Sequence, residues 1–219
     1  MIIGVSGSPI VGGNTDRMVK AVLEKSGRET KFINLSTLKY SPCRACAHHC
    51  GTTNVCGVKD DLQPILLEIR DADALVLGSP IQHGNMTGWM FGFISRLWSL
   101  YQVHKLLEGR PTLFVSTGIR PKDIQAGIAS FEWGSRSFKI LGHIYFNSRT
   151  PPCYKCGAGN YCKVGGLWGL LEHDEEKLKN FKLTPDLFKQ WEDDPQVVAE
   201  VEHYGRVLSE QRGKPKPRI

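Results

Sequence analysis

Residues 2–10 read IIGVSGSPI, and residues 74–81 read ALVLGSPI. Each stretch begins with a short aliphatic run, which is typical of a buried β-strand, and ends in Gly-Ser-Pro, which marks a tight turn. Helical patterns follow both turns, because Asn14 and Thr15 are good N-capping residues and residues 86–107 are amphipathic over their whole length. This order of strand, turn and helix decides the fold class.

Strand and helix patterns alternate five times along the chain. Expected strands cover residues 2–6, 31–35, 73–77, 111–117 and 140–146. Expected helices begin near residue 14 and cover residues 60–70, 86–107 and 122–138. The alternation predicts an α/β protein whose parallel sheet has helices on both faces. We therefore expect a sheet domain over residues 1–147 with a cysteine-containing loop at 41–58, followed by a loop-rich and helical C-terminal extension over residues 148–219.

The composition is that of an ordinary globular protein. Of the 219 residues, 41% are hydrophobic and 23% are charged, and the formal net charge is +6. A charge of this size suits a phosphate-bearing ligand but is a weak signal for nucleic acid, so we expect no nucleic-acid partner. The apolar stretches are far shorter than the roughly 18 residues that cross a bilayer, and the N-terminus has no basic region like that of a secretory signal. We expect a cytoplasmic protein that binds no membrane.

Ligands of an open α/β sheet bind beyond the carboxyl ends of its strands, so the loops at that edge are the candidate sites. Residues 7–15 are rich in Gly, Ser and Thr and lead into a helix N-terminus, where N–H groups and hydroxyls can hold a phosphate. Neither a Walker loop nor a G-x-G-x-x-G fingerprint is present. Residues 78–88 form another glycine-rich turn, whose backbone suits the edge of a planar heterocycle. An ordinary strand–helix turn is the alternative for each loop.

All seven cysteines fall in two groups. The first group is four thiols within 14 residues, namely Cys43, Cys46, Cys50 and Cys56. The second group is Cys153, Cys156 and Cys162. Because a reducing cytosol disfavours disulfides, clustered thiols point to a metal or redox site. Both groups follow expected strands, so we expect both to lie at the ligand edge of the sheet.

Four thiols in one short loop are the ligand set of a [4Fe–4S] cluster. Zinc also takes four thiolates, usually from two separated Cys-x2-Cys pairs, so zinc and free thiols stay open as alternatives. The second group lacks a fourth ligand, for which His173, an acidic side chain, water or a partner's residue are candidates. It is interpreted as a second iron–sulfur or zinc site, or as three ordinary cysteines.

The paired loops resemble those of the flavodoxin-like NADPH-dependent FMN reductase superfamily, and the first cysteine group resembles the motif of its iron–sulfur flavoprotein branch. The resemblance rests on residues 7–9 and 13–15, read together with the run SPIQHGNMTG at residues 79–88. It implies a flavodoxin-like, doubly wound sheet of five parallel strands in the order 2-1-3-4-5. The strands before the two cysteine groups would then lie on opposite edges, about 19 Å apart at about 4.8 Å per strand, so the two groups should not share one centre. Departures are Ile10, where many relatives have a basic or polar residue, Gln82, where many have an aromatic residue, and a three-residue second gap between the cysteines.

The resemblance also implies FMN as the ligand and names its contacts. Carried over to this sequence, the phosphate loop supplies Ser8, Pro9, Gly13, Asn14 and Thr15. The isoalloxazine ring would lie along Pro80, Ile81, Gln82, His83, Gly84 and Asn85, with Thr117 and Gly118 flanking its other side. The iron–sulfur cluster would take the four thiols of the first group.

By this resemblance, the chain is an FMN-dependent iron–sulfur oxidoreductase that moves electrons between a one-electron donor or NAD(P)H and an unidentified acceptor. A homodimer or homotetramer and a ferredoxin-like electron partner are implied. Two alternatives stay open: an NAD(P)H-dependent FMN or quinone reductase with a structural zinc loop, and a non-catalytic electron carrier or maturation scaffold. Trp89, Phe91, Phe93 and Trp98 suit a core or a subunit interface, and no residue is assigned as an acid–base catalyst.

Overall fold

The computed structural model describes residues 1–118, 137–148, 158–182 and 187–212, together with the single residues 129, 131, 156 and 184. Cys153 and nearly all of the helix predicted over residues 122–138 lie outside the described residues.

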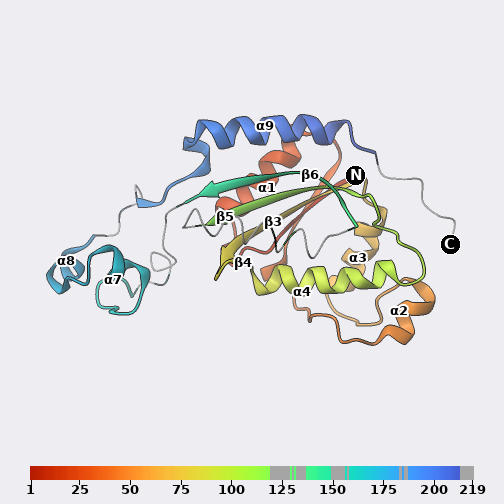
Figure 1. The fold of residues 1–219 in the computed structure, drawn as a ribbon, viewed down its shortest axis with the longest axis horizontal. Helices are drawn as coiled ribbons and strands as arrows, with labels where there is room; N and C mark the ends of the chain where they lie inside the picture. Colours follow the sequence, from red (N-terminus) through yellow and green to blue (C-terminus); the bar gives the residue numbers. More distant parts are fainter. Residues whose placement is uncertain are drawn as a thin grey trace.

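A parallel sheet forms the centre of the molecule (Figure 1). Its long strands are β1 (Ile2–Ser6), β2 (Thr30–Asn34), β3 (Ala74–Gln82), β5 (Pro111–Gly118) and β6 (Lys139–Asn147). They lie in the order β2-β1-β3-β5-β6, and each neighbouring pair is parallel. Numbered along the chain without the short β4 (Asn85–Met86), this is the predicted order 2-1-3-4-5, so the doubly wound, flavodoxin-like topology is confirmed.

One short strand was not predicted. β4 (Asn85–Met86) pairs antiparallel with the end of β3, where Ile81 opposes Met86 and Gln82 opposes Asn85. The two residues between them, His83 and Gly84, have φ values of 50° and 75°. Two consecutive residues with positive φ form the turn that suits a tight hairpin. Two residues are too few to show strand alternation, so the sequence pattern here is that of a loop.

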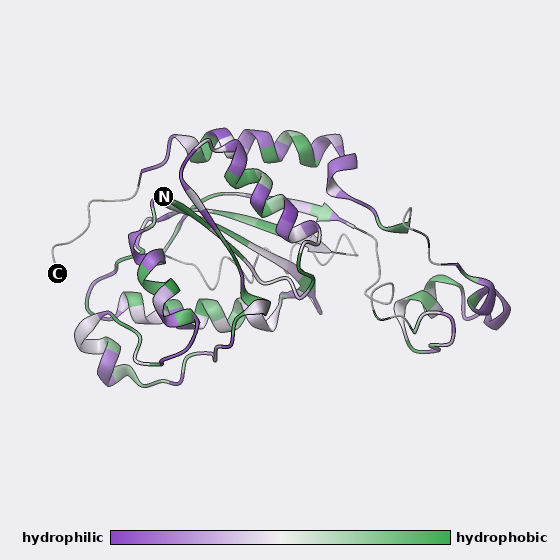
Figure 2. Cartoon of the chain, turned by 180° about the vertical axis from the view of Figure 1, so that it is seen from behind, coloured by the Kyte–Doolittle hydropathy of each residue, from purple (hydrophilic) through white to green (hydrophobic). Residues whose placement is uncertain are grey.

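Helices cover both faces of the sheet (Figure 1). One face is covered by α1 (Asn14–Lys25) and α9 (Pro195–Ser209), and the other by α3 (Leu62–Asp71) and α4 (Gly88–Leu97). The two apolar cores follow this division: Met18 and Val201 pack on one side, and Phe93 packs on the other. Figure 2 shows the apolar strands enclosed between helices with mixed surfaces. The helix α9 of the C-terminal extension therefore belongs to the layer that α1 begins.

The helix predicted over residues 86–107 is shorter in the structure. α4 ends at Leu97, and a 3-10 turn, η2 (Trp98–Tyr101), follows it. The buried Asn54 side chain donates to the Ser99 and His104 carbonyls at 3.1 and 3.2 Å and accepts from the His104 amide at 2.7 Å. These bonds take backbone groups that a longer helix would need, so the chain turns although its apolar pattern continues.

The remaining elements are short. They are η1 (Leu35–Thr37), α2 (Ala47–Thr53), α7 (Gly166–Leu170), α8 (Glu175–Asn180) and η4 (Trp191–Asp193). Figure 1 shows α7 and α8 beyond the carboxyl ends of the strands and α2 near the opposite end of the sheet. Among the described residues, no helix has the length and apolar character needed to cross a bilayer.

Candidate functional site

Two contacts made by buried threonine hydroxyl groups join the three loops that are predicted to hold FMN. Thr15 Oγ1 lies 3.0 Å from Thr117 Oγ1, which connects the start of α1 to the end of β5. Thr87 Oγ1 donates to the Gly7 carbonyl at 2.7 Å and also caps α4 by accepting from the Met90 amide. The structure therefore brings the loops after β1, β3 and β5 together at the carboxyl edge of the sheet.

The N-terminus of α1 has no side-chain cap. Gly13 occupies the N-cap position, so the expectation that Asn14 or Thr15 caps this helix is wrong. The loop before it is held by Ser8 Oγ, which bonds both the amide and the carbonyl of Ile10, and by Asp16, which accepts from the Gly12 amide at 2.9 Å. A fixed loop ahead of an uncapped helix N-terminus is an arrangement that binds phosphate groups.

Asn14, a predicted phosphate contact, has another structural role. Its side chain donates to the Lys189 carbonyl at 2.9 Å and accepts from the Trp191 amide at 3.3 Å. It also accepts from Arg17 at 2.7 Å, and Arg17 pairs with Glu192 at 2.6 Å. The Asn14 side chain thus anchors the C-terminal segment to the phosphate loop, which leaves its backbone N–H as the group for a ligand.

The predicted ring-binding residues lie on the β3–β4 hairpin. Gln82, His83 and Asn85 are exposed at its tip, whereas Ile81 is buried in the core. Pro80 and Gly84 are half-buried. A cavity of about 670 Å³ opens at the same edge of the sheet, beside Phe146, Asn147 and residues 188–190 and 193–195. The three exposed residues at the hairpin tip leave this part of the edge accessible to a ligand.

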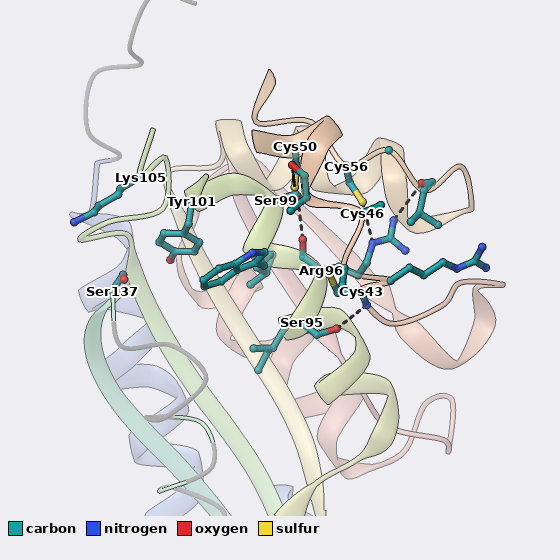
Figure 3. Close-up of a pocket in the computed structure, with 18 of the residues that line it drawn as sticks. Cys43, Cys46, Cys50, Cys56, Ser95, Arg96, Ser99, Tyr101, Lys105 and Ser137 are labelled. Atoms are coloured by element: carbon teal, nitrogen blue, oxygen red, sulfur yellow. Dashed lines mark hydrogen bonds between the residues drawn. The ribbon is translucent and has the colours of Figure 1, made fainter. Parts of the chain in front are cut away.

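The four cysteines of the first group line one cavity of about 750 Å³. Cys50, on α2, and Cys56 are buried, while Cys46 is half-buried and Cys43 is exposed. Figure 3 shows the four cysteines gathered toward one end of this cavity, with Tyr101, Lys105 and Ser137 toward the other. The four thiols therefore face one cavity, and their role as metal ligands stays a prediction.

Two consecutive residues of α4 hold the first and the last of these cysteines. Ser95 Oγ accepts from the Cys43 amide at 3.0 Å, and Arg96 Nε donates to Cys56 Sγ at 3.2 Å. Asn54, just past α2, bonds to the backbone of η2 as described above. The whole cysteine loop is thereby fixed against the C-terminal half of α4.

The expected position of the first cysteine group at the ligand edge is therefore wrong. α4 begins at Gly88, next to the loops after β1, β3 and β5 that are predicted to hold FMN and are called the FMN-type loops below. Its 10 residues span about 15 Å at about 1.5 Å per residue. The cysteine cavity lies at the far end of this helix, and Figure 1 shows α2 near the end of the sheet where β1 begins. The reason is that the loop after β2 is long enough to run the length of α4.

The thiols influence one another electrostatically. Burial raises the pKa of the Cys50 thiol, and the neighbouring Cys56, Cys46 and Cys43 raise this pKa further. Within the described part of the chain, no three His, Cys, Asp or Glu side chains lie close enough together to hold a metal ion. The donor set of four thiols around one cavity fits an iron–sulfur cluster, which would bind the cysteines as deprotonated thiolates.

The second cysteine group has no comparable geometry among the described residues. Cys156 is exposed and Cys162 is half-buried, and neither lines the cavity of the first group. His173, a candidate fourth ligand, lies edge-on to Trp168, with ring centroids 5.4 Å apart. Since Cys153 is outside the described residues, the second site stays a prediction.

Sequence reasoning missed Ser95, Arg96, Asp60 and Asn54, which shape the first cysteine loop. Burial alone would raise the pKa of Asp60, but hydrogen bonds from Arg96 and the Ser41 amide outweigh it and hold this pKa below its usual range. One signal was available. Arg96 lies on the buried face of a largely apolar helix, between Phe93 and Leu97. An arginine is almost never fully buried unless it is paired.

Comparison with known proteins identifies the family. The family profile described as NADPH-dependent FMN reductase matches residues 1–129. The chain belongs to this family. The chain is 37% identical over 89 residues to an iron–sulfur flavoprotein of Methanocaldococcus jannaschii, covering 39% of this chain and 46% of that protein. It is 29% identical over 120 residues to an iron–sulfur flavoprotein of Methanosarcina thermophila, covering 53% of this chain and 62% of that protein.

The similarity of this FMN reductase family member to solved structures concerns the fold. An NADH:FMN oxidoreductase in its apo form superposes with a TM-score of 0.54 at 17% identity, covering 99% of this chain and 96% of the other. The chain spans about half the length of the curated relatives it matches. Together these findings confirm the resemblance to the iron–sulfur flavoprotein branch, and they support flavin-dependent redox chemistry with FMN as the ligand.

Proposed function

We propose that this FMN reductase family member is an iron–sulfur flavoprotein that transfers electrons between a one-electron donor or NAD(P)H and an acceptor. FMN would occupy the carboxyl edge, and a [4Fe–4S] cluster would bind Cys43, Cys46, Cys50 and Cys56. The observation that carries the proposal is the single cavity lined by all four thiols. When bound, FMN supplies exchange between two-electron and one-electron steps, and the cluster supplies one-electron transfer. The clustered thiols suit a reducing compartment, so we place this activity in the cytoplasm.

The residues at the carboxyl edge would bind and orient FMN. The uncapped first turn of α1 offers N–H groups to the phosphate, and Ser8 and Asp16 hold the preceding loop in shape. Arg17, near the start of α1, is engaged by Glu192, so the backbone rather than this cation would carry most of the phosphate binding. The β3–β4 hairpin and the end of β5 at Thr117 and Gly118 would lie along the ring.

The separation of the two sites supports transfer between copies of the chain. Within one chain, the length of α4, about 15 Å, separates the cysteine cavity from the FMN-type loops. α4 and the adjoining turn η2 carry an apolar stripe, defined here as Phe91, Ile94 and Trp98. Phe91 and Trp98 are 41% and 59% exposed, and Ile94 is half-buried. Ile94 and Trp98 also line the cysteine cavity. We therefore propose a homodimer or homotetramer that covers this stripe, with the cluster of one copy serving the FMN of another.

The first test is anaerobic purification with counts of FMN, iron, sulfide and zinc per chain and an absorbance spectrum. FMN with about four iron and four sulfide atoms supports the proposal, and about seven or eight iron atoms would add the second cysteine group. Zinc without iron would replace the proposal with a plain FMN reductase that carries a structural zinc loop. Absence of both FMN and iron would overturn it.

Kinetics then separate an enzyme from an electron carrier. An enzyme should reduce its FMN with NADH or NADPH, or with a reduced ferredoxin-like protein, and should turn over with a small acceptor. A carrier or maturation scaffold should exchange electrons with the ferredoxin-like protein but show no steady-state turnover with any small acceptor.

A further inference from the structure

Every N–H group of the Arg96 guanidinium donates a hydrogen bond to a residue in the cysteine loop or directly after it. The residue is 1% exposed. Its Nε donates to Cys56 Sγ at 3.2 Å, and its Nη1 donates to the Ser41 carbonyl at 2.9 Å and to Asp60 at 2.6 Å. Its Nη2 donates to the Val58 carbonyl at 3.3 Å and to the other Asp60 oxygen at 3.1 Å. An arginine has five N–H groups in a fixed fork, and here each has an acceptor.

These bonds close the cysteine loop at its base. Ser41 lies two residues before Cys43, and Asp60 lies four residues after Cys56. The Ser41 amide also donates to Asp60 at 3.2 Å, so the two ends of the loop are joined directly and through Arg96. Ser95, the neighbour of Arg96, accepts from the Cys43 amide. α4 therefore fixes both ends of the segment that carries the four thiols.

Stability alone does not account for a buried arginine at this place. The side chains of Arg96 and Asp60 are 0% and 12% exposed, and replacing such a buried ion pair by apolar residues is often neutral or stabilising. An apolar residue, however, could donate no hydrogen bond to a thiolate. Lysine could not reproduce the contacts either, because its three donors radiate from one atom.

We propose that Arg96 is a positioning residue for the iron–sulfur cluster. It holds the Cys56 side chain in its ligand orientation, and its Nε–H donates to the same sulfur when the cluster is bound. A hydrogen bond to a ligand sulfur stabilises the cluster more in its reduced state, which carries one more negative charge, and therefore raises its reduction potential. This inference rests on the proposed function, because it requires a cluster at the four thiols.

The test uses the full chain purified without oxygen, in which the cluster is titrated against redox dyes and its loss to an iron chelator is timed. The variants are Arg96→Lys, which keeps a charge opposite Asp60, and Arg96→Gln combined with Asp60→Asn, which leaves no buried charge unpaired. We expect the ratio of reduced to oxidised cluster at a fixed potential to fall at least tenfold, which is about 59 mV for one electron. We expect iron loss to be 10–100-fold faster, as for other residues that orient metal ligands.

Arg110→Lys is the matched control. Arg110 is also buried and donates to backbone carbonyls, those of Arg70 and Leu106, but it does not line the cysteine cavity. This variant should keep the wild-type midpoint and rate of iron loss. FMN content and the urea midpoint of each variant report whether the domain is folded.

The outcomes separate this inference from the proposed function. A wild-type chain with FMN but no iron would refute the cluster, and with it both proposals. A wild-type chain with its cluster, together with unchanged midpoints and iron loss in both Arg96 variants, would refute the role of Arg96 alone. A folded Arg96 variant that keeps FMN but cannot retain iron supports the positioning role, provided that the Arg110 control retains it.

Discussion

Individual polar residues give the cysteine loop its shape. The Asn54 side chain donates to the Ser99 carbonyl just beyond α4. Ser95 accepts from the Cys43 amide, and Arg96 donates to the Cys56 sulfur. Buried polar groups are costly unless they are fully hydrogen-bonded, so each of these contacts fixes one arrangement of the loop. The thiols are therefore presented to a common cavity before any ligand is bound.

The ligand assignment predicts that Cys46→Ala loses the first cluster and keeps FMN. The FMN-type loops lie at the other end of α4, so removing one thiol should not disturb them. Iron and sulfide should fall by about four atoms each per chain, while the FMN content stays at the wild-type level. Cys162→Ala, whose thiol does not line the cavity, should retain the four-thiol cluster. Full iron content and unchanged absorbance in Cys46→Ala would show that Cys46 is not a ligand.

The buried side chain of His143 should make the stability of the folded protein fall in acid. Burial lowers the pKa of His143 to about 4, from an ordinary value of 6.5. Its Nε2 lies 2.7 Å from Ser116 Oγ. Because the unfolded chain takes up a proton below pH 6.5 and the folded chain does not until about 4, stability falls as the pH drops through this range. The full effect is roughly 3 kcal/mol.

Urea denaturation of the wild type and of His143→Gln at pH 7 and pH 5 measures this effect. The wild type should lose more stability between the two pH values than the variant, because glutamine does not titrate. Equal losses in the two proteins would show that His143 is not protonated differently on unfolding.

At the scale of elements, the contact between α1 and α9 depends on a glycine. A Cβ added at Gly205 would lie 2.4 Å from Lys25 Cβ and 3.0 Å from the Lys25 backbone carbon. Gly205→Ala should therefore lower the free energy of unfolding, since overpacking costs about 1–3 kcal/mol and alanine regains at most about 1 kcal/mol in helix propensity.

Denaturation by urea, followed by circular dichroism, measures this loss. Gly169→Ala, in α7, is the control, because an added Cβ there meets nothing within 4 Å. Its midpoint should be unchanged or slightly raised. A Gly205→Ala protein as stable as the wild type would mean that α9 does not pack this closely on α1.

At the scale of the whole molecule, the apolar stripe of Phe91, Ile94 and Trp98 predicts the oligomer. Phe91→Glu would place a charge in an apolar interface and should weaken association at least tenfold, so that light scattering finds monomers where the wild type forms dimers or tetramers. Leu170→Glu changes a residue on α7 that is 60% exposed and should keep the wild-type mass. An unchanged mass in Phe91→Glu would place the interface elsewhere.

The alternation of strands and helices and the four-thiol motif could be read from the sequence, whereas the strand order followed from the family resemblance. Aliphatic runs, Gly-Ser-Pro turns and cysteine spacings are local patterns, and the apolar runs of β1 and β5 belong to strands that are buried at every position. Local patterns were less informative where a contact with a residue distant in the sequence determines the structure. α4 stops at Leu97 because Asn54, far away along the chain, takes the backbone groups that follow, and the β3–β4 hairpin depends on two residues with positive φ.

The placement of the two sites at opposite ends of α4 could be known only from the fold. Arg96 donates a hydrogen bond to Cys56, 40 positions away in the sequence, and Asn14 donates one to Lys189, 175 positions away. No periodicity or spacing encodes such pairs, because they arise when separate segments compete for the same buried hydrogen-bonding groups. The amino acids thus specified which chemistry the chain carries, and chain packing specified where each group of residues came to lie.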